Sequence, residues 1–367
     1  MVSEDDIKTV GKQFRIHGEF INAIPYGGGH INDTFAAEYN QGGAPMRYIF
    51  QRINHNIFKD PALLMENVSR VLSHSHDRLA DIDDASRRAL TLIPSISNQA
   101  YVIDQEDSYW RVYIFIEKAK TYDVVETEKQ AFEAARAFGN FQKLLVDIPG
   151  ERLKETIPDF HNTVQRYQTL VAAIEADSLN RAKDVQAEID FITQRESDTS
   201  AIIDGINDGS IPERITHNDT KLNNIMIDEK TLEGICVIDL DTVMPGSALY
   251  DFGDLVRTST SPALEDEQDL SKVVMQPDMF QALAQGYLKA ARSFLTTREL
   301  ELLPFSGKLI TLEIGIRFLT DYLEGDVYFK IHREGHNLDR CRTQLKLVAS
   351  IEEQMDAMAG LVEEFNR

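Results

Sequence analysis

Short apolar runs separated by turn residues fill the first part of the chain, and this pattern predicts strands. Strands are expected at residues 20–26, 31–39, 48–53, 90–93, 101–103 and 110–116, and one helix at 61–73. The Gly27-Gly28-Gly29 turn joins the first two strands, as in a hairpin. The first 117 residues are therefore expected to form a small, mostly antiparallel lobe.

From residue 118 onward the apolar positions recur at helical spacing instead. Helices are expected at 129–145, across 160–197 as a pair, at 276–294, at 298–324 and at 345–365. The change of pattern follows Ile116 and Glu117. We predict an α+β fold of two lobes, with a small antiparallel β lobe over residues 1–117 and a large, mainly α lobe over residues 118–367.

Three polar residues of the large lobe carry candidate chemistry. Asp219 is followed five residues later by Asn224, and Asp239 closes a short apolar run. Phosphoryl transfer needs a carboxylate that takes the proton of an attacking hydroxyl, and oxygen ligands for the magnesium that bridges the nucleotide phosphates. Asp219 fits the first task, and Asn224 with Asp239 the second. The alternative is a surface hairpin with Asp and Asn at ordinary turn positions.

The two metal candidates flank a predicted hairpin with strands at 225–228 and 235–238. If the last residue of the first strand pairs with the first residue of the second, Asn224 lies opposite Asp239. Directly opposed residues have Cβ atoms about 5 Å apart, so both side chains would reach one ion.

Several segments resemble the aminoglycoside phosphotransferase and choline kinase group of small-molecule kinases, and within it most of all the N-acetylhexosamine 1-kinases. The matching segments are His-Asn-Asp-Thr-Lys-Leu-Asn-Asn at 217–224, Ile-Asp-Leu-Asp-Thr-Val-Met-Pro-Gly at 238–246, Tyr-Asp-Phe-Gly-Asp at 250–254, and residues 26–32 and 317–326. The resemblance runs from about residue 14 to about residue 350. It implies a protein-kinase-like fold, with nucleotide in lobe 1–117 and the catalytic loop and acceptor site in lobe 118–367.

On the nucleotide side, glycines such as Gly28 and Gly29 let backbone N–H groups approach phosphates. The resemblance implies that the backbone at Ile116 and Glu117 meets adenine. The following strand lacks the lysine with which kinases usually hold the phosphates. Arg52 is its only cation, but strand alternation places Gln51 and Arg52 on opposite faces, so the residue that faces the nucleotide stays open.

On the acceptor side, Glu313, Arg317 and Asp321 recur every four residues along one predicted helix face. They form either a solvated ladder of ion pairs or a polar wall for a substrate. The resemblance favours the wall, with Arg317 and Tyr328 as sugar contacts. It also suggests His30 as an acceptor contact, and Asp219, as the base, contacts the same acceptor. Asp241, two residues after Asp239, faces either the acceptor or the surroundings of the metal, and we group it with the acceptor contacts.

The formal net charge of -22 argues against nucleic acid and anionic membranes as partners, because both need a basic footprint. No apolar run approaches the roughly 18 residues of a membrane span, and the chain opens on the acidic residues 4–6. Cys236 and Cys341 form no zinc or disulfide pattern, which suits a reducing cytoplasm. No protein partner is evident.

Together these features predict a cytoplasmic kinase that uses ATP and Mg²⁺ to phosphorylate a small molecule. The resemblance implies the anomeric hydroxyl of an N-acetylhexosamine, GlcNAc or GalNAc, as the acceptor. Two alternatives remain at this point. One is a kinase of the same fold for an aminoglycoside, choline, homoserine or another sugar, and the other is a nucleotide-binding pseudokinase without the strand lysine.

Overall fold

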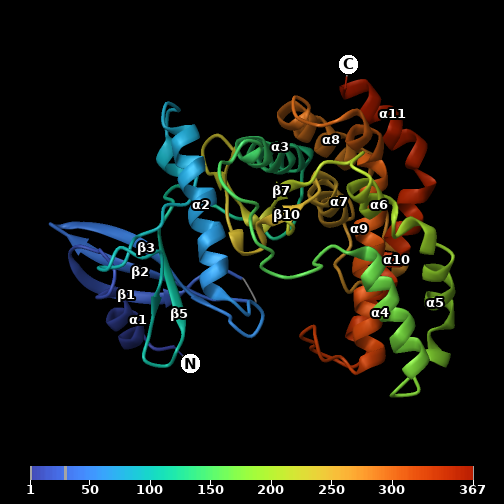
Figure 1. Cartoon of the computed structure of the whole chain (residues 1–367), viewed down its shortest axis with the longest axis horizontal. Coiled ribbons are helices and arrows are strands. Elements are labelled where there is room, and N and C mark those ends of the chain that lie inside the picture. Colours follow the sequence, from blue (N-terminus) through green and yellow to red (C-terminus); the bar gives the residue numbers. More distant parts are fainter. Residues whose placement is uncertain (1, 29–30, 367) are drawn as a thin grey trace.

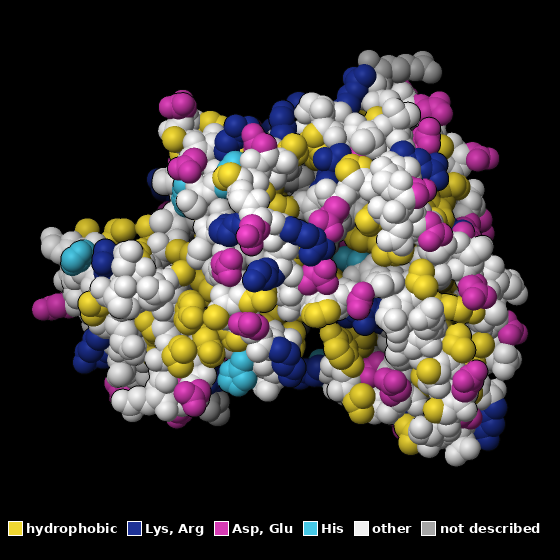
Figure 2. All heavy atoms as spheres, viewed as in Figure 1, with side chains coloured by type: hydrophobic (Ala, Val, Ile, Leu, Met, Phe, Trp, Pro, Cys, Tyr) yellow, Lys and Arg dark blue, Asp and Glu magenta, His cyan; other side chains and the backbone are white. Residues whose placement is uncertain are grey.

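The computed structural model describes residues 2–28 and 31–366. Figure 1 shows a sheet-bearing N-terminal part beside a larger helical part, so the predicted two-lobed α+β fold is confirmed. Figure 2 shows that the surface is indented between the two parts, at the lower centre of the view. Among the described residues, no helix is long and apolar enough to cross a membrane.

The N-terminal part is an antiparallel sheet with the strand order β1-β2-β3-β5-β4. Its elements are α1 (Glu4–Gly11), β1 (Glu19–Pro25), β2 (Asp33–Gln41), β3 (Ala44–Ile53), α2 (Pro61–Leu79), β4 (Val102–Ile103) and β5 (Tyr109–Ile114). One face of the sheet buries Phe35, Phe50 and Trp110 against α1. Because side chains alternate along a strand, the opposite face is left for the site described below.

Helix α2 ties the sheet to the helical part. It starts at the capping residue Asp60 with Pro61 in the first turn, and it buries the predicted stripe of Leu64, Val68 and Val71. These side chains belong to the same core as those of the helical part, whereas the core beneath α1 is separate. The sheet is therefore anchored mainly through α2 and through β5.

The helical part surrounds two short sheets, β7 with β10 and β6-β8-β9. Its strands are β6 (Ala119–Lys120), β7 (Arg214–Thr216), β8 (Ile225–Asp228), β9 (Gly234–Val237) and β10 (Met244–Gly246). Its helices are α3 (Glu128–Leu145), α4 (Thr163–Ala176), α5 (Gln186–Thr193), α6 (Ala201–Asn207), α7 (Ala248–Ser259), α8 (Pro277–Ala291), α9 (Thr297–Glu324), α10 (His336–Glu353) and α11 (Met355–Phe365).

Several elements differ from the sequence expectations, three of them in the predicted segments themselves. Residues 90–93 form no strand, because only Leu92 makes an isolated bridge, with Tyr113 of β5. The terminal helix starts earlier than expected, at His336, and breaks at Gln354 into α10 and α11. Helix α2 continues past the expected end to Leu79.

Candidate active site

Residues 217–224, which we call the catalytic loop after their predicted role, follow β7, and a buried carboxylate of α7 holds their backbone. The N–H groups of His217 and Asn218 donate to the two carboxylate oxygens of Asp251 at 2.9 and 2.7 Å. The Thr220 hydroxyl donates to the Asp251 carbonyl at 2.6 Å. Asp251 is fully buried, so these bonds are shielded from water and fix the loop to the helix.

His217 joins the catalytic loop to the end of β9. Its Nδ1 accepts the backbone N–H of Asp219 at 3.3 Å, so Nε2 carries the proton and donates to the Ile238 carbonyl at 2.9 Å. Two phenylalanines of α3 pack edge-on against the ring. Because Ile238 precedes Asp239, one imidazole positions both Asp219 and Asp239.

The carboxylate of Asp219 is engaged by two neighbours in its own loop. Lys221 Nζ lies 3.0 Å from one oxygen, and the Asn224 amide donates to the other at 3.1 Å. Burial alone raises the pKa of Asp219, but the charge and hydrogen bond of Lys221, together with His217 and Arg257, outweigh it and hold the pKa below its ordinary value. Asp219 is therefore ionised at neutral pH and can accept a hydrogen bond from a hydroxyl.

The β8–β9 hairpin forms as predicted, but its register differs by one residue. Met226 pairs with Cys236, and the Asn224 carbonyl accepts the N–H of Ile238 at 2.9 Å. Asn224 is thus opposite Ile238 and not opposite Asp239, as expected from the sequence. The cause is the turn, which closes two residues earlier than expected, with the Asp228 N–H donating to the Glu233 carbonyl. The extra β9 residue at the irregularity after Met226 recovers only one of these two positions. Asp239 follows in the left-handed region, at φ 58°, and still lines the same pocket as Asn224.

The donors around this hairpin suit a hard cation. Asn224 makes both of its side-chain contacts through its amide nitrogen, which leaves the amide oxygen for an ion. Burial and the negative charges of Asp241 and Asp219 raise the pKa of Asp239 to about 6. Asn223 adds a buried amide oxygen with no hydrogen-bond partner among the described residues. Mg²⁺ takes few protein ligands beside phosphate oxygens, so this oxygen set fits it.

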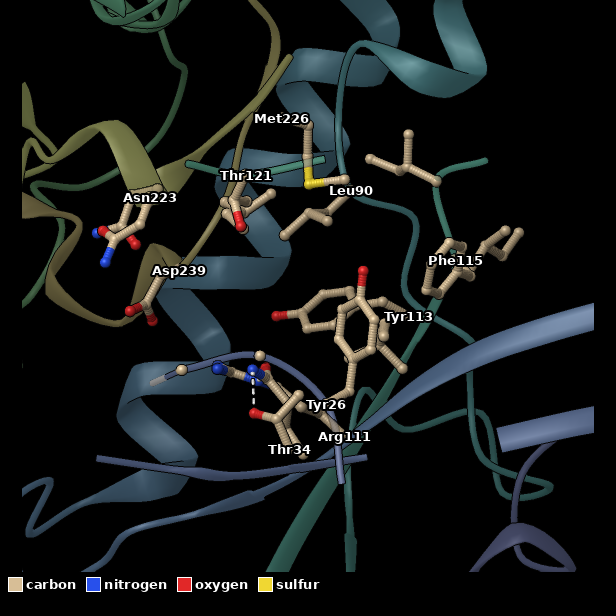
Figure 3. Close-up of a pocket in the computed structure, with 18 of the residues that line it drawn as sticks. Tyr26, Thr34, Leu90, Arg111, Tyr113, Phe115, Thr121, Asn223, Met226 and Asp239 are labelled. Carbon is tan, nitrogen blue, oxygen red and sulfur yellow. Dashed lines mark hydrogen bonds between the residues drawn. The ribbon is translucent and has the colours of Figure 1, made fainter. Parts of the chain in front are cut away.

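A pocket lies between the N-terminal sheet and the hairpin (Figure 3). In that view Asp239 and Asn223 lie on one side, while Thr34 and Arg111 come from the N-terminal sheet and Tyr26 from the residue directly after β1. Gly28 and Ile116 also line the pocket. Gly29 and His30, both named from the sequence, lie outside the described residues. The structure therefore brings one expected glycine and one hinge residue next to the metal candidates.

Glu117, the other expected hinge residue, is engaged elsewhere. Its carboxylate pairs with Arg47, with one bond at 2.9 Å. Its carbonyl accepts from Arg87 at 2.9 Å. Glu117 is also absent from the pocket lining, which leaves Ile116 as the hinge residue at the pocket.

Strand β3 presents Gln51 to the pocket and turns Arg52 away from it. Arg52 instead pairs with Asp33 at 2.6 Å, on the partly exposed opposite face. The cation inside the pocket is Arg111 of β5, which the sequence analysis did not find. Its only signal in the sequence was a charged residue within the apolar run at 110–116.

Asp241 lies on the side of the site that faces the N-terminal sheet. From the sequence we grouped it with the acceptor contacts, but its carboxylate pairs with Arg111 and accepts the Asn32 amide at 2.6 Å. The short 3₁₀ turn at 240–242 directs this side chain toward the sheet. Both carboxylate oxygens are therefore occupied by N-terminal residues.

Only one member of the predicted polar row on α9 faces a free surface. Arg317 lies between the rings of Phe160, Tyr328 and Phe329, with its guanidinium carbon 5.5, 5.8 and 5.5 Å from their centroids. We call these four residues the acceptor wall. Glu313 is fully buried and cannot contact a ligand directly.

Asp321 fixes the loop that carries Tyr328. Its carboxylate accepts the backbone N–H groups of Val327, Tyr328 and Phe329 at 2.8, 2.7 and 2.9 Å. Asp321 is buried, so it has a structural task and does not belong to the wall itself. Arg317 and Tyr328, expected from the sequence as acceptor contacts, are thus brought together by Asp321, which lies on the same helix as Arg317 and holds the loop of Tyr328.

A second residue that the sequence analysis did not find is His161. Its Nδ1 lies 2.9 Å from Glu313 Oε1 and its Nε2 lies 3.1 Å from the Asn218 carbonyl. Both neighbours are acceptors, so both ring nitrogens donate and the imidazole is charged. Burial lowers the pKa of His161, but the Glu313 carboxylate more than offsets it and raises the pKa above its ordinary value. His161 therefore links α9 to the carbonyl that precedes Asp219.

With this geometry in place, the chain can be compared with known proteins. The model of the phosphotransferase enzyme family, which includes the aminoglycoside phosphotransferases, matches residues 22–294, well over half of the chain. The protein belongs to this family. It is an ATP-dependent small-molecule phosphotransferase of the kinase type, with a hydroxyl group as acceptor.

Several solved structures share the fold over nearly the whole chain. An aminoglycoside phosphotransferase from Alicyclobacillus acidocaldarius is similar with a TM-score of 0.63 and 11% identity, covering 99% of this chain and 97% of that one. A microcompartment-associated aminopropanol kinase gives 0.59 and 14%, with 96% and 98% covered. Choline kinase from Cryptosporidium parvum gives 0.55 and 14%, with 99% of each chain covered. At these identities the likeness shows the fold alone.

Proposed function

We propose that this protein transfers the γ-phosphate of ATP to the anomeric hydroxyl of an N-acetylhexosamine, which gives the sugar 1-phosphate. The observation that carries the proposal is the acceptor wall, because it presents a guanidinium and three aromatic rings. An arginine fork donates to hydroxyl and acetamido oxygens, and aromatic rings pack against the apolar face of a pyranose. The sequence resemblance points to the same acceptor.

The charge of the wall argues against cationic acceptors. Arg166 lies beside the wall, because its Nη2 donates to the Phe160 carbonyl at 3.1 Å, and burial and the charge of Arg317 lower its pKa. Two arginines would repel an amino alcohol or an aminoglycoside. Amino alcohols and aminoglycosides remain the competing acceptors, because structurally similar proteins are named for aminopropanol, choline and aminoglycosides.

We assign the proton transfer to Asp219. Its carboxylate is ionised and Lys221 stabilises that charge, so it is a weak base. A weak base suffices for an anomeric hydroxyl, which is more acidic than other sugar hydroxyls. The same Lys221, 40% exposed at its side chain, is placed in the loop to stabilise negative charge on the transferred phosphoryl group.

Asn224 and Asp239 would hold Mg²⁺, with Asn223 beside them. When bound, the ion neutralises charge on the nucleotide phosphates. We assign nucleotide binding to lobe 1–117, with Gly28 over the phosphates and Ile116 near the base, and acceptor binding to lobe 118–367. We expect the enzyme to work in the cytoplasm, where its two free thiols stay reduced.

The test is a screen of free sugars and amino alcohols for ADP release, followed by phosphorus NMR of the product. We expect turnover with GlcNAc or GalNAc and a phosphate on C1. Methyl glycosides of the same sugars should bind without reacting, because they lack the anomeric hydroxyl. A phosphate on C6 or C3, or turnover of choline or aminopropanol alone, would contradict the proposed acceptor.

A further inference from the structure

The pocket contains a cation that comes from a different strand than in most kinases. Gln51 of β3 and Arg111 of β5 are directly paired across the sheet, so their side chains share one face. The Arg111 Nε donates to the Gln51 Oε1 at 2.9 Å, and the Gln51 amide donates to Thr34 at 3.1 Å. Gln51 therefore holds the Arg111 side chain in place. Because Gln51 is neutral, Arg111 carries the positive charge at this position.

Arg111 is fully buried, and two features of its guanidinium indicate a ligand-binding role. Its Nη1 pairs with Asp241, whose other oxygen accepts from Asn32 at 2.6 Å. Its Nη2 is buried without a hydrogen-bond partner among the described residues. A buried donor without an acceptor costs stability, and a guanidinium is retained in such a position when a ligand supplies the acceptor.

The surroundings of Arg111 indicate which ligand this is. The pocket that it lines also contains Gly28, Asn224 and Asp239. Phosphate oxygens are the natural acceptors for a guanidinium fork, since they bind it in two-point geometry. The site thus places an unsatisfied cationic donor beside the glycine turn and the metal candidates.

We propose that Arg111 binds the α- and β-phosphates of the nucleotide, and that Asp241 and Gln51 position its guanidinium for this task. In other kinases a β3 lysine does this and pairs with a glutamate of the following helix. Here α2 presents the Met65 sulfur to Arg111, at 3.9 Å, and the carboxylate comes from Asp241 instead. The inference rests on the proposed nucleotide site but not on the identity of the acceptor.

Arg52 is the competing cation, and the structure separates it from the pocket. It lies one residue after Gln51 on the other face of β3, with Asp33 as its partner. The alternative for Arg111 is a purely structural role, in which its buried ion pair with Asp241 of the 240–242 turn joins the two parts of the molecule. The experiment has to distinguish phosphate binding from both alternatives.

The experiment is calorimetric titration of adenosine and ADP, with Mg²⁺ present throughout, into the wild type, Arg111→Met and Arg52→Met. For Arg111→Met we expect ADP to bind about 10–100-fold more weakly, the range of a charged hydrogen bond, and adenosine to change less than about 2-fold. Arg52→Met should leave both affinities unchanged. Adding Gln51→Lys to Arg111→Met should restore part of the ADP affinity, because it returns the cation to β3.

Equal weakening of adenosine and ADP would overturn the proposal, since it would mean that Arg111 only joins the two parts. Weakening of ADP by Arg52→Met but not by Arg111→Met would also overturn it. If Arg111→Met does not fold, Arg111→Met with Asp241→Leu replaces it, because removing both charges avoids an unpaired buried carboxylate. A wild type that binds neither adenosine nor ADP would instead contradict the proposed nucleotide site as a whole.

Discussion

The catalytic loop and the acceptor wall are held in place by different kinds of interaction. In the loop, His217, Asn218 and Thr220 are all buried, and each is bonded to Asp251 at 2.9 Å or less. In the wall, Arg317 forms no ion pair with any described residue and is held by aromatic rings. Tyr328 is 64% exposed.

This difference separates the chemistry from the choice of substrate. A buried, fully bonded polar network specifies one geometry, and a change within it disturbs every member. An exposed wall on a loop tolerates substitution, because its side chains have few obligatory partners. We therefore expect variants of the loop to lower kcat and variants of the wall to raise KM for the acceptor.

The largest effect is expected for Asp239→Ala. It should abolish turnover and weaken binding of Mg-ATP more than binding of adenosine, because only the former needs the metal ligand. Turnover close to that of the wild type would show that the metal is held elsewhere.

Asp239 also gives a stability signature without metal. Its folded pKa, about 6, lies above the ordinary 3.8, so the folded protein binds the extra proton between these values. Its contribution to stability therefore declines as the pH rises from 3.8 to about 6. Asp239→Ala should remove that decline in thermal melts of the metal-free protein. If the variant shows the same decline in thermal stability as the wild type, a group other than Asp239 causes it.

Next in size is Asp219→Asn, which removes the proposed base and keeps the side-chain shape. We expect kcat to fall by about 10²–10⁴-fold, the range for a positioned acid–base group, with little change in the affinity for ATP. Steady-state kinetics with both substrates would measure this. A loss of only a few fold would mean that another group takes the proton.

The loop was more predictable from the sequence than the rest of the site. Asp219, Asn224 and Asp239 lie within one hairpin and its approach, so local strand geometry brought them together even with the register wrong by one residue. Arg111 and Asp241 are 130 positions apart, and His161 and Glu313 are 152 apart. No spacing rule covers such distances, so these pairs became visible only in the folded chain.

The same holds for the fold. Strands β2, β3 and β5 and helices α3, α8 and α9 were predicted because their burial pattern repeats along the sequence. Helix α1 was not, although Ser3 and Asp6 form a capping box that favours a helix start, because its eight residues bury only Ile7, Val10 and Gly11 and show too little of a repeating apolar stripe. The apolar residues 90–93 suggested a strand but pack at the edge of β5 with almost no ladder.

His161→Gln tests whether the wall and the loop are independent. The variant leaves Glu313 buried without its charged partner, which typically costs about 3–5 kcal/mol of unfolding free energy. It should also lower kcat, because His161 donates to the carbonyl that precedes Asp219. If instead only KM for the acceptor changes, the division between chemistry and substrate choice fails at this residue.

The pH dependence of this cost follows from the direction of two pKa shifts. The pKa of His161 is raised above 6.5, so its contribution is complete below that value and is lost as pH rises through the folded pKa. The pKa of Glu313 is lowered from 4.5, so its contribution is present above 4.5 and is lost in acid. Denaturant melts should show the largest gap between wild type and variant from pH 4.5 to 6.5. A gap that does not vary with pH would contradict the ion pair.

The smallest effect is expected at the wall itself. Arg317→Ala removes a guanidinium that the proposed sugar would use as a hydrogen-bond donor, so acceptor affinity should fall by about 1.5–3 kcal/mol. The affinity for ATP and kcat at saturating sugar should stay close to the wild-type values, since no described member of the catalytic loop contacts Arg317. Arg342→Ala is the matched control, because this arginine pairs with Glu188 on α5 and should leave both affinities unchanged. Steady-state kinetics over a range of sugar concentrations separates KM from kcat. A fall in kcat as large as the rise in KM would show that Arg317 acts in the transition state, and the wall would then belong with the chemistry.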